Sequence, residues 1–554
     1  MNKTKPLLNI LVVVGALLTS FHFLQAQSKV TTSVGGKKRT IELLHANSGE
    51  HDDKLGGGAQ RLIGNAAFKD GNTIMYCDSA YLYENNSADA FGHIHITQGD
   101  SINAYGEFLK YNGDTKIGQL DKNVSLTDKD MILTTNTLFF NTKNNVATYH
   151  DGGTIVNKEN TLTSQHGYYF SNTKELAFKK NVVLTNPRYT MMGDTLNYNT
   201  ASKITRFLGP TRIKSKDDFI YCENGFYNTV TDIAQFDKNA YIISKNQKLK
   251  ADSMFYDKKN GIGKGFQNIS ITDTTQNIII NGDYGYSNEL TNTAIVTGNA
   301  VMSQIYEKDT LFVHADTLKA AYEKKSIADN QYAAGSNVQS AVNKQQLTSN
   351  NQDSTYRILL AYHKVKFFKS DIQGKCDSMA YTYRDSIMRL FKEPILWSQK
   401  NQLTAENIEL KTSKGALQSM LMTNSAFIIS QEDSLKFNQI KGKIMHGFFA
   451  DNKLYKIHVE GNGQTVYYGK DKNKYIGVNK ADCSDLLIFM KNNEVQKITF
   501  ITKPDATLFP INELSPKELL LKNFLWKIDL RPKSKKDIFV WEEEPKALSN
   551  ENKQ

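Results

Sequence analysis

The feature that most constrains this chain is a small side chain that recurs every 29 residues. The step varies elsewhere in the chain: it is 27 residues from 77 to 104 and 33 residues from 282 to 315. An internal period of this length indicates repeated supersecondary units rather than several unrelated domains. The regular series consists of Thr135, Ser164, Gly193, Cys222 and Ala251.

The segments between these small residues have the pattern of β-strands. Apolar and polar residues alternate, as in 123–126 and 239–242, and Asn, Gly and Asp stand between the runs. This alternation, with many Tyr, Phe, Thr and Ile residues, is typical of strands. The chain has only 9 Pro, and Pro removes a donor from a strand ladder. We therefore predict an all-β fold, with a short helix expected only at 515–524.

The alternation changes phase once in each unit. Leu249 and Ala251 fall on one face of a strand, but the next apolar pair, Met254 and Tyr256, falls on the other face. A strand that keeps its apolar side inward must turn a corner between them. We expect the small residue just inside that corner. Each unit is then predicted to be one bent coil of a parallel stack, in an elongated β-jelly roll or β-solenoid with about 29 residues per repeat.

The N-terminus has the pattern of a secretory signal peptide. Lys3 and Lys5 precede an apolar run at 7–18, and a short segment follows to Ala26; the run is short for a bilayer span. A permanently anchored N-terminus is the alternative. The predicted divisions are a signal peptide (1–26), a linker (27–39), repeats (40–323), a polar insertion (324–356), further repeats (357–502) and a C-terminal tail (503–554).

An acid or amide follows the small residue in nearly every unit. These side chains could form a carbohydrate-lyase or Ca²⁺ site, but an active site would appear once rather than in each repeat. Corner residues that hydrogen-bond nearby backbone N–H groups explain the recurrence better. The acids are Asp78, Asp194, Glu223, Asp252, Asp283, Asp316, Asp377, Glu406 and Asp482.

No motif for catalysis or cofactor binding stands out. His93 and His95 would share one face of a strand, but no third metal ligand has a matching spacing. Cys77, Cys222 and Cys376 occupy the small-residue position and are interpreted as buried small side chains. We predict no catalytic residue, no metal, no cofactor and no enzymatic activity.

Composition and charge argue against a wholly disordered chain and against a nucleic-acid-binding protein. The hydrophobic content of 40% is enough for a core, so the chain is not wholly disordered. The net charge of +11 would suit acidic or phosphorylated partners. Nucleic acid is not expected as a partner, because the basic residues form no stripe and the chain is expected to be exported.

Two sets of residues carry a resemblance to a known family. The Ala-Asp-Ser-x-x-Tyr unit at 251–256 and the Gly-Asn-Ala-Val-Met unit at 298–302 resemble the OstA-like domain of lipopolysaccharide-transport proteins, as in LptA and the N-terminal part of LptD. The later segments 371–378, 438–443 and 476–481 are similar to the long OstA-like proteins of the Bacteroidetes type. The resemblance extends over about 40–500, and the chain is far longer than a typical LptA.

The resemblance implies a non-enzymatic periplasmic bridge that carries lipopolysaccharide, through its lipid A, toward the outer membrane. It favours an open groove over a closed section, with acyl chains in the groove. Partners would be jelly rolls of the LptC or LptD type, or further copies of this chain, paired edge to edge. The alternative is a closed β-helix that binds or degrades polysaccharide.

Apolar residues just beyond the corner are the predicted lining of the groove. The rival interpretation of the same residues is an ordinary dry core. They are Leu138, Phe140, Leu196, Tyr198, Met254, Tyr256, Ile269 and Ile271.

Overall fold

The computed structural model describes residues 41–541, apart from 53–58, 325–354 and connections of one to three residues. The predicted signal peptide (1–26), the linker (27–39) and most of the predicted insertion lie outside the described residues. By its internal contacts the chain forms two compact units, unit 1 up to Phe266 and unit 2 from Gln267.

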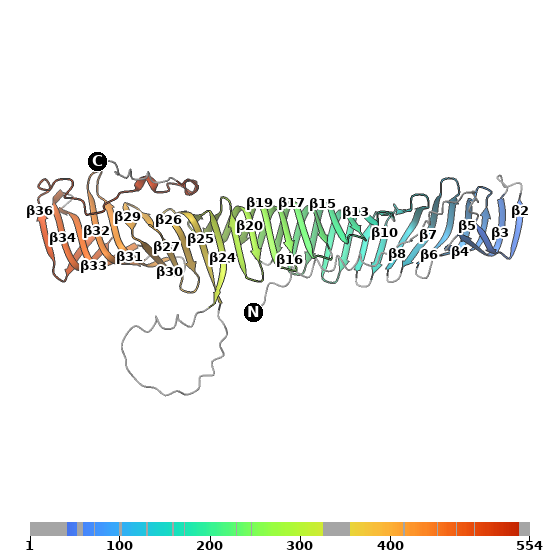
Figure 1. Ribbon diagram of the computed structural model, residues 1–554, viewed down its shortest axis with the longest axis horizontal. Helices are drawn as coiled ribbons and strands as arrows, with labels where there is room; N and C mark the ends of the chain where they lie inside the picture. The colour runs from blue at the N-terminus through green and yellow to red at the C-terminus, as the bar shows by residue number, and fades with distance from the viewer. Residues whose placement is uncertain are drawn as a thin grey trace, which may run out of the picture. The chain divides into compact units, whose positions relative to one another are not determined.

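Almost all of the described chain is β-strand, as the sequence predicts, and Figure 1 shows neighbouring strands of each unit side by side. The strands of unit 1 are β1 (Glu42–His45), β2 (Ser48–Asp52), β3 (Ala59–Asp70), β4 (Thr73–Leu82), β5 (Ala88–Gln98), β6 (Ile102–Asn112), β7 (Ile117–Asp128), β8 (Met131–Asn141), β9 (Val146–Tyr149), β10 (Gly153–Asn157), β11 (Asn160–Ser164), β12 (His166–Phe170), β13 (Glu175–Asn186), β14 (Tyr189–Asn199), β15 (Ile204–Ser215), β16 (Asp218–Asn228), β17 (Ile233–Ser244) and β18 (Gln247–Asp257).

The boundary between the units falls inside β19 (Ile262–Asp273). The strands of unit 2 are β20 (Ile278–Asn288), β21 (Thr293–Thr297), β22 (Val301–Ile305), β23 (Thr310–His314), β24 (Thr317–Lys324), β25 (Thr355–Phe368), β26 (Gln373–Thr382), β27 (Ile387–Phe391), β28 (Ile395–Ser398), β29 (Asn401–Thr404), β30 (Asn407–Ser413), β31 (Ala416–Gln431), β32 (Phe437–Ala450), β33 (Lys453–Asp471), β34 (Lys474–Lys491), β35 (Glu494–Ile501) and β36 (Asp505–Phe509).

Neighbouring strands run antiparallel, which corrects the predicted parallel stack. One 29-residue repeat is a pair of strands, such as β13 and β14, in which Val182 lies opposite Gly193. Short connections permit only antiparallel neighbours, because a parallel pair needs a long crossover. A parallel β-helix, the alternative suggested by the sequence, therefore does not describe this fold.

The predicted corner is present and is built as a β-bulge. In β13, Lys180 and Asn181 have φ values of 61° and 53°, and the register with β14 shifts at this point. Two residues in the left-handed backbone conformation on one strand lie opposite a single residue on the next strand, and this mismatch bends both strands. Most of the small residues at the corner are buried, as predicted, with Cys222 and Ala251 fully inaccessible to solvent, whereas Thr135 and Gly193 are half-buried.

The corner divides each long strand between two walls. In unit 1 we call wall A the part of a strand that ends in a tight hairpin, such as 189–192 of β14, and wall B the other part, such as 195–199. Strand segments of unit 2 that continue a wall by pairing keep its name, with 401–404 and 437–442 on wall A and 407–413 and 444–450 on wall B. Wall B ends in Asn turns. In one of them Asn199 Oδ1 accepts hydrogen bonds from the backbone N–H groups of Ala201 and Ser202 at 3.0 and 2.9 Å. Apolar side chains from both walls point into the space between them.

The C-terminal region differs from its prediction in two ways. The sheet continues through β36, beyond the predicted end of the repeats at 502. Residues 515–524, expected to be a short helix, form turns instead, and the helical elements that follow are two 3₁₀ turns, η2 (Ile528–Leu530) and η3 (Asp537–Phe539). Among the described residues no helix is long and apolar enough to cross a membrane.

Candidate functional site

The eight residues predicted to line a groove all belong to the interior. Five of them are buried, and Phe140, Tyr256 and Ile271 are half-buried. Six of the eight lie in unit 1 and two lie in β19. Contact with lipid stays a prediction for this set.

Three consecutive repeats of unit 1 carry a buried tyrosine on wall B, and together these tyrosines form a column. These residues stand five positions after the small corner residue and therefore share the 29-residue spacing. Their exposed fractions are 7% for Tyr169, 0% for Tyr198 and 1% for Tyr227. Burial, with help from the charge of Asp128, raises the pKa of Tyr169 to about 12. Because Asp128 ends β7 on wall A, the two walls approach each other here.

Polar residues at the wall A hairpins of unit 1 are buried under this column. Asn186 Nδ2 donates a hydrogen bond to Asn160 Oδ1 at 2.7 Å, and both side chains are inaccessible. Side chains at a strand end become buried only when other parts of the chain cover them, and the electrostatic influence of Tyr189 on Tyr227 and of Asp128 on Tyr169 places wall B close to these hairpins. The buried set is Asp128, Asn157, Asn160, Asn186, Tyr189 and Asp218.

Unit 2 instead contains a large cavity between its walls. The cavity has a volume of about 870 Å³ and is lined by residues from β22 through β35, which is within the range of pockets that hold small-molecule ligands. Its inner surface is apolar and rich in methionine. Representative lining residues are Met302, Met379, Leu403, Met420, Ile457 and Ile488.

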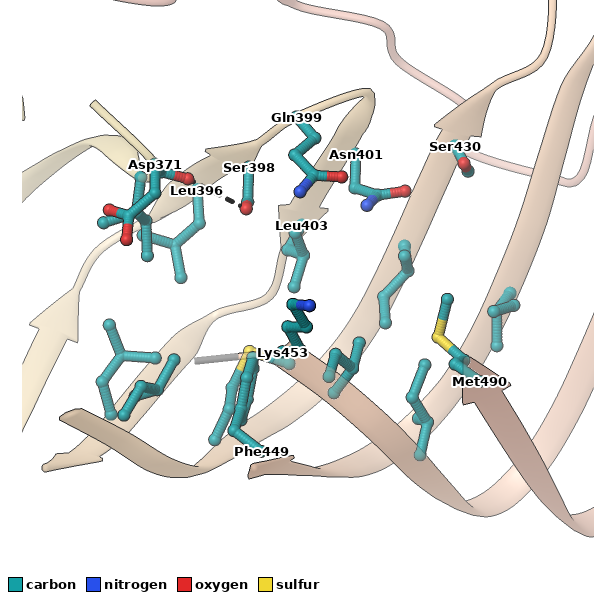
Figure 2. Close-up of a pocket in the computed structure, with 18 of the residues that line it drawn as sticks. Asp371, Leu396, Ser398, Gln399, Asn401, Leu403, Ser430, Phe449, Lys453 and Met490 are labelled. Atoms are coloured by element: carbon teal, nitrogen blue, oxygen red, sulfur yellow. Dashed lines mark hydrogen bonds between the residues drawn. The ribbon is translucent and has the colours of Figure 1, made fainter. Parts of the chain in front are cut away.

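The rim of the cavity on wall A is polar. Figure 2 shows Asp371, Ser398, Gln399 and Asn401 together along this rim, with Leu403 directed into the cavity below them. Lys369 Nζ lies 2.6 Å from Asp371 Oδ2, so this part of the rim carries an ion pair.

The rim on wall B is different in character. Phe449 and Met490 give it an apolar surface, and Lys453 is the cation beside them in Figure 2. An apolar interior with polar and charged groups along its mouth suits an amphiphile, whose tails avoid water while its head group stays hydrated.

The position that forms the column in unit 1 also reaches the cavity in unit 2. Five residues after the corner, unit 1 has Tyr198 and Tyr227 but also Leu82 and Leu109, and unit 2 has Tyr381 and Leu410, which both line the cavity. The residue type at this position therefore does not by itself distinguish the two units, and the sequence pattern did not identify the cavity.

The corner acids link neighbouring strands. Asn299 Nδ2 donates to Asp283 Oδ2 at 2.8 Å, and Asn239 Nδ2 donates to Glu223 Oε1 at 2.8 Å. Their partners here are side chains at the left-handed corner of the next strand, rather than the local backbone N–H groups that we expected. The acids are spread one per corner along the sheet, and this arrangement serves structure.

The predicted histidine pair is separated by a corner. His93 has a φ of 44° and lies 2.8 Å from Asp78 Oδ2, whereas His95 contacts Asn103 and stacks on Tyr105. Within the described part of the chain, no group of three or more His, Cys, Asp or Glu side chains could hold a metal ion.

The cysteines are buried thiols. Burial raises the pKa of Cys222 and of Cys376 to about 12. A thiol with so high a pKa carries almost no thiolate at neutral pH and is a poor nucleophile.

Comparisons with known proteins agree with this architecture. The model of the OstA-like protein family matches residues 38–194 and 190–252, and a model described as LptA/(LptD N-terminal domain) LPS transport protein matches residues 279–416. No curated protein matches the chain.

One solved structure in the comparison is the crystal structure of LptH from Pseudomonas aeruginosa, the LptA homologous periplasmic component of its lipopolysaccharide transport device. It is 17% identical, and the match covers 19% of this chain and 79% of that chain with a TM-score of 0.18. A TM-score this low carries no argument, so the assignment rests on the family models and on the fold described above. By these matches the chain is an OstA-like protein over residues 38–252, with a region similar to LptA and the LptD N-terminal domain at 279–416.

Proposed function

We propose that this chain is a non-enzymatic lipid carrier of the periplasm that holds the acyl chains of lipopolysaccharide in the cavity of unit 2. The observation that carries the proposal is the apolar cavity of about 870 Å³ with a polar and charged mouth. The family model that matches residues 279–416 supports the proposal, since it is described as an LPS transport protein.

An acyl chain that crosses an aqueous compartment needs such a cavity because its exposure to water is costly. Exposing one 12-carbon acyl chain to water costs on the order of 10 kcal/mol, at about 0.8 kcal/mol per CH₂ group. A lipid with several chains therefore needs a shield to cross an aqueous compartment. The methionines in the cavity suit this role because their flexible, unbranched side chains adapt to irregular apolar ligands.

The rest of the proposal concerns place and partners. The predicted signal peptide would bring the chain to the periplasm, and the lipid would move toward the outer membrane. Strands at the ends of a sheet have unpaired backbone groups, so jelly rolls of the LptC or LptD type, or a second copy, could pair with them edge to edge.

Site-specific photo-crosslinking in cells tests the cavity. Adjacent strand residues point to opposite faces, so Met420, which lines the cavity, has a matched control in Leu421 of the same strand. We expect a crosslinker at Met420 to capture lipopolysaccharide and one at Leu421 to capture none. Equal labelling at both positions would refute the proposal.

The predicted lining of unit 1 has its own test. A crosslinker at Met254 or Tyr256 is compared with one at Asp252. Capture at the first two positions alone would mean that the aromatic column opens for lipid. Capture only in unit 2 would confine the lipid to the cavity described here.

A further inference from the structure

The segment 515–541, which we call the strap, lies along the outer face of wall A in unit 2. It runs against the order of the strands, because its beginning is held by β34 and its end by β25. Lys480 Nζ donates to the carbonyl of Glu518 at 2.8 Å, and Lys366 Nζ donates to the carbonyl of Val540. Figure 1 shows this segment along β26 to β32.

Two glutamine side chains of wall A each donate a hydrogen bond to a carbonyl of the strap and accept one from an N–H group of the strap. Gln402 Nε2 donates to Leu525 O, and Lys527 N donates to Gln402 Oε1, both at 2.7 Å. Gln439 makes the same pair of bonds with Leu519 O and Leu521 N, both at 2.8 Å.

Both glutamine side chains are almost inaccessible, at 0% and 1% exposed. Each amide therefore satisfies one carbonyl and one N–H group of the strap backbone.

Apolar contacts accompany this ladder. Val466, Tyr468 and Val478 form a small cluster on wall A against which Leu519 and Leu521 pack. Further along, the ring of Phe437 lies 5.3 Å from those of Phe524 and Trp526, and Lys375 Nζ lies 4.3 Å from the ring of Trp541. The outer face of wall A in unit 2 thus offers apolar contacts to the strap beside the polar ones.

The strap also forms hydrogen bonds with the rim of the cavity. Arg531 Nη1 donates to the carbonyl of Gln399 at 2.7 Å, and Arg531 Nε donates to Gln373 Oε1 at 2.7 Å. The side chain of Gln399 lines the mouth of the cavity. Gln402, which holds the strap, immediately precedes Leu403, which points into the cavity. The hairpin of β28 and β29 therefore contacts the strap with one face and the cavity with the other.

We propose that the strap is a latch that sets the position of the β28–β29 rim and thereby controls how tightly the cavity holds its lipid. This inference rests on the proposed function of the cavity. When the strap is docked, the rim hairpin is fixed from behind. When it is released, the hairpin loses its contacts on the outer face, the mouth loosens and lipid leaves more readily.

The test uses the full-length chain with Gln402→Leu and Gln439→Leu together. Leucine keeps the bulk of the side chain but removes the amide, so four backbone groups of the strap lose their partners. We expect hydrogen exchange of the strap and of residues 395–404 to accelerate by about tenfold or more. Lipid capture by a crosslinker at Met420 should fall several-fold.

Two further variants keep the result interpretable. Gln464→Leu is the matched control, because Gln464 Nε2 bonds to Asp482 Oδ1 at 2.7 Å and contributes nothing to the ladder. Arg531→Ala, which removes only the contacts at the rim, covers the case in which the double variant fails to fold. It should loosen residues 395–404 and lower capture while Gln464→Leu does neither.

The outcomes separate the two proposals. A released strap with unchanged lipid capture overturns the latch and leaves the lipid carrier intact. A strap whose exchange is unaffected by the double variant overturns the latch as well. Failure of the unmodified chain to capture lipid at Met420 overturns the proposed function itself.

Discussion

Unit 1 and unit 2 are built from the same bent, antiparallel repeat, but the described side chains between their walls differ. In unit 1, Tyr198 and Tyr227 on wall B are almost fully buried. In unit 2 a cavity of about 870 Å³ lies between the walls, and Tyr381 and Leu410 at the same repeat position line it. The backbone repeat therefore sets the two walls, and the side chains between them determine how much space is left.

Truncation of an aromatic residue should separate the units most clearly. Phe207 in unit 1 is 1% exposed, whereas Phe449 of unit 2 is half-buried beside the cavity. We expect Phe207→Ala to destabilise unit 1 by about 3–5 kcal/mol, because it leaves a void in a packed interior. We expect Phe449→Ala to destabilise unit 2 by roughly half of that or less.

Hydrogen exchange of the strands in each unit measures the two changes separately, since a chain with two units need not unfold in one step. Similar losses in both units would mean that the interior of unit 2 is as tightly packed as that of unit 1.

Enlarging a side chain is the converse experiment. Ala234 is fully buried in unit 1, so Ala234→Phe should destabilise that unit by about 1–3 kcal/mol through overpacking. Leu403→Trp in unit 2 should extend into the cavity with little effect on stability and should reduce lipid capture. Unit-resolved hydrogen exchange and crosslinking at Met420 measure the two effects. A large loss of stability from Leu403→Trp would argue against a cavity of the size described.

The smallest expected effects on stability are at the corners. A corner pair in unit 1 should lose its stabilising contribution as pH rises, and one in unit 2 should lose its contribution as pH falls. In unit 1 the hydrogen bond to Asp78 raises the pKa of His93 above its usual 6.5. The stabilisation from this pair is therefore complete below pH 6.5 and is lost as pH rises through the raised pKa. In unit 2, hydrogen bonds from Ser378 and then from His363 and Lys392 lower the pKa of Asp377.

The contribution of Asp377 is present above its usual pKa of 3.8 and is lost as pH falls through the lowered value. Titration of His93 by NMR, with Asp78→Asn as the control, measures the first effect, and titration of the Asp377 carboxyl, with Asp377→Asn as the assignment control, measures the second. A His93 pKa at or below 6.5 would contradict the geometry of its corner.

Much of the fold was predictable because it depends on local patterns. The phase change around Ala251 located the corner, and the burial of Ala251 and Cys222 confirmed that small side chains are needed there. Strand direction was predicted wrongly, because a repeat of 29 residues fits one parallel coil as well as two antiparallel strands. The continuation of the sheet through β36 was missed because the spacing becomes irregular near the C-terminus.

The candidate site was less predictable than the fold. The predicted lining residues lie in the interior, but none lines the cavity of unit 2. Leu410 and Tyr381 follow the same spacing as Tyr198, and a sequence pattern gives no distance between opposite walls. The strap was expected to begin with a helix, yet that part forms turns, and Gln402 and Gln439 bind the strap backbone from positions 80 or more residues away in the chain.

The sequence by itself determined the all-β repeat, the place of the corner and the burial of the small residues, because alternation and spacing act over a few neighbouring residues. Only the tertiary structure decided where the cavity of unit 2 lies and where the strap docks. These outcomes depend on whether a side chain reaches across from one wall to the other, and on contacts between residues far apart in the chain.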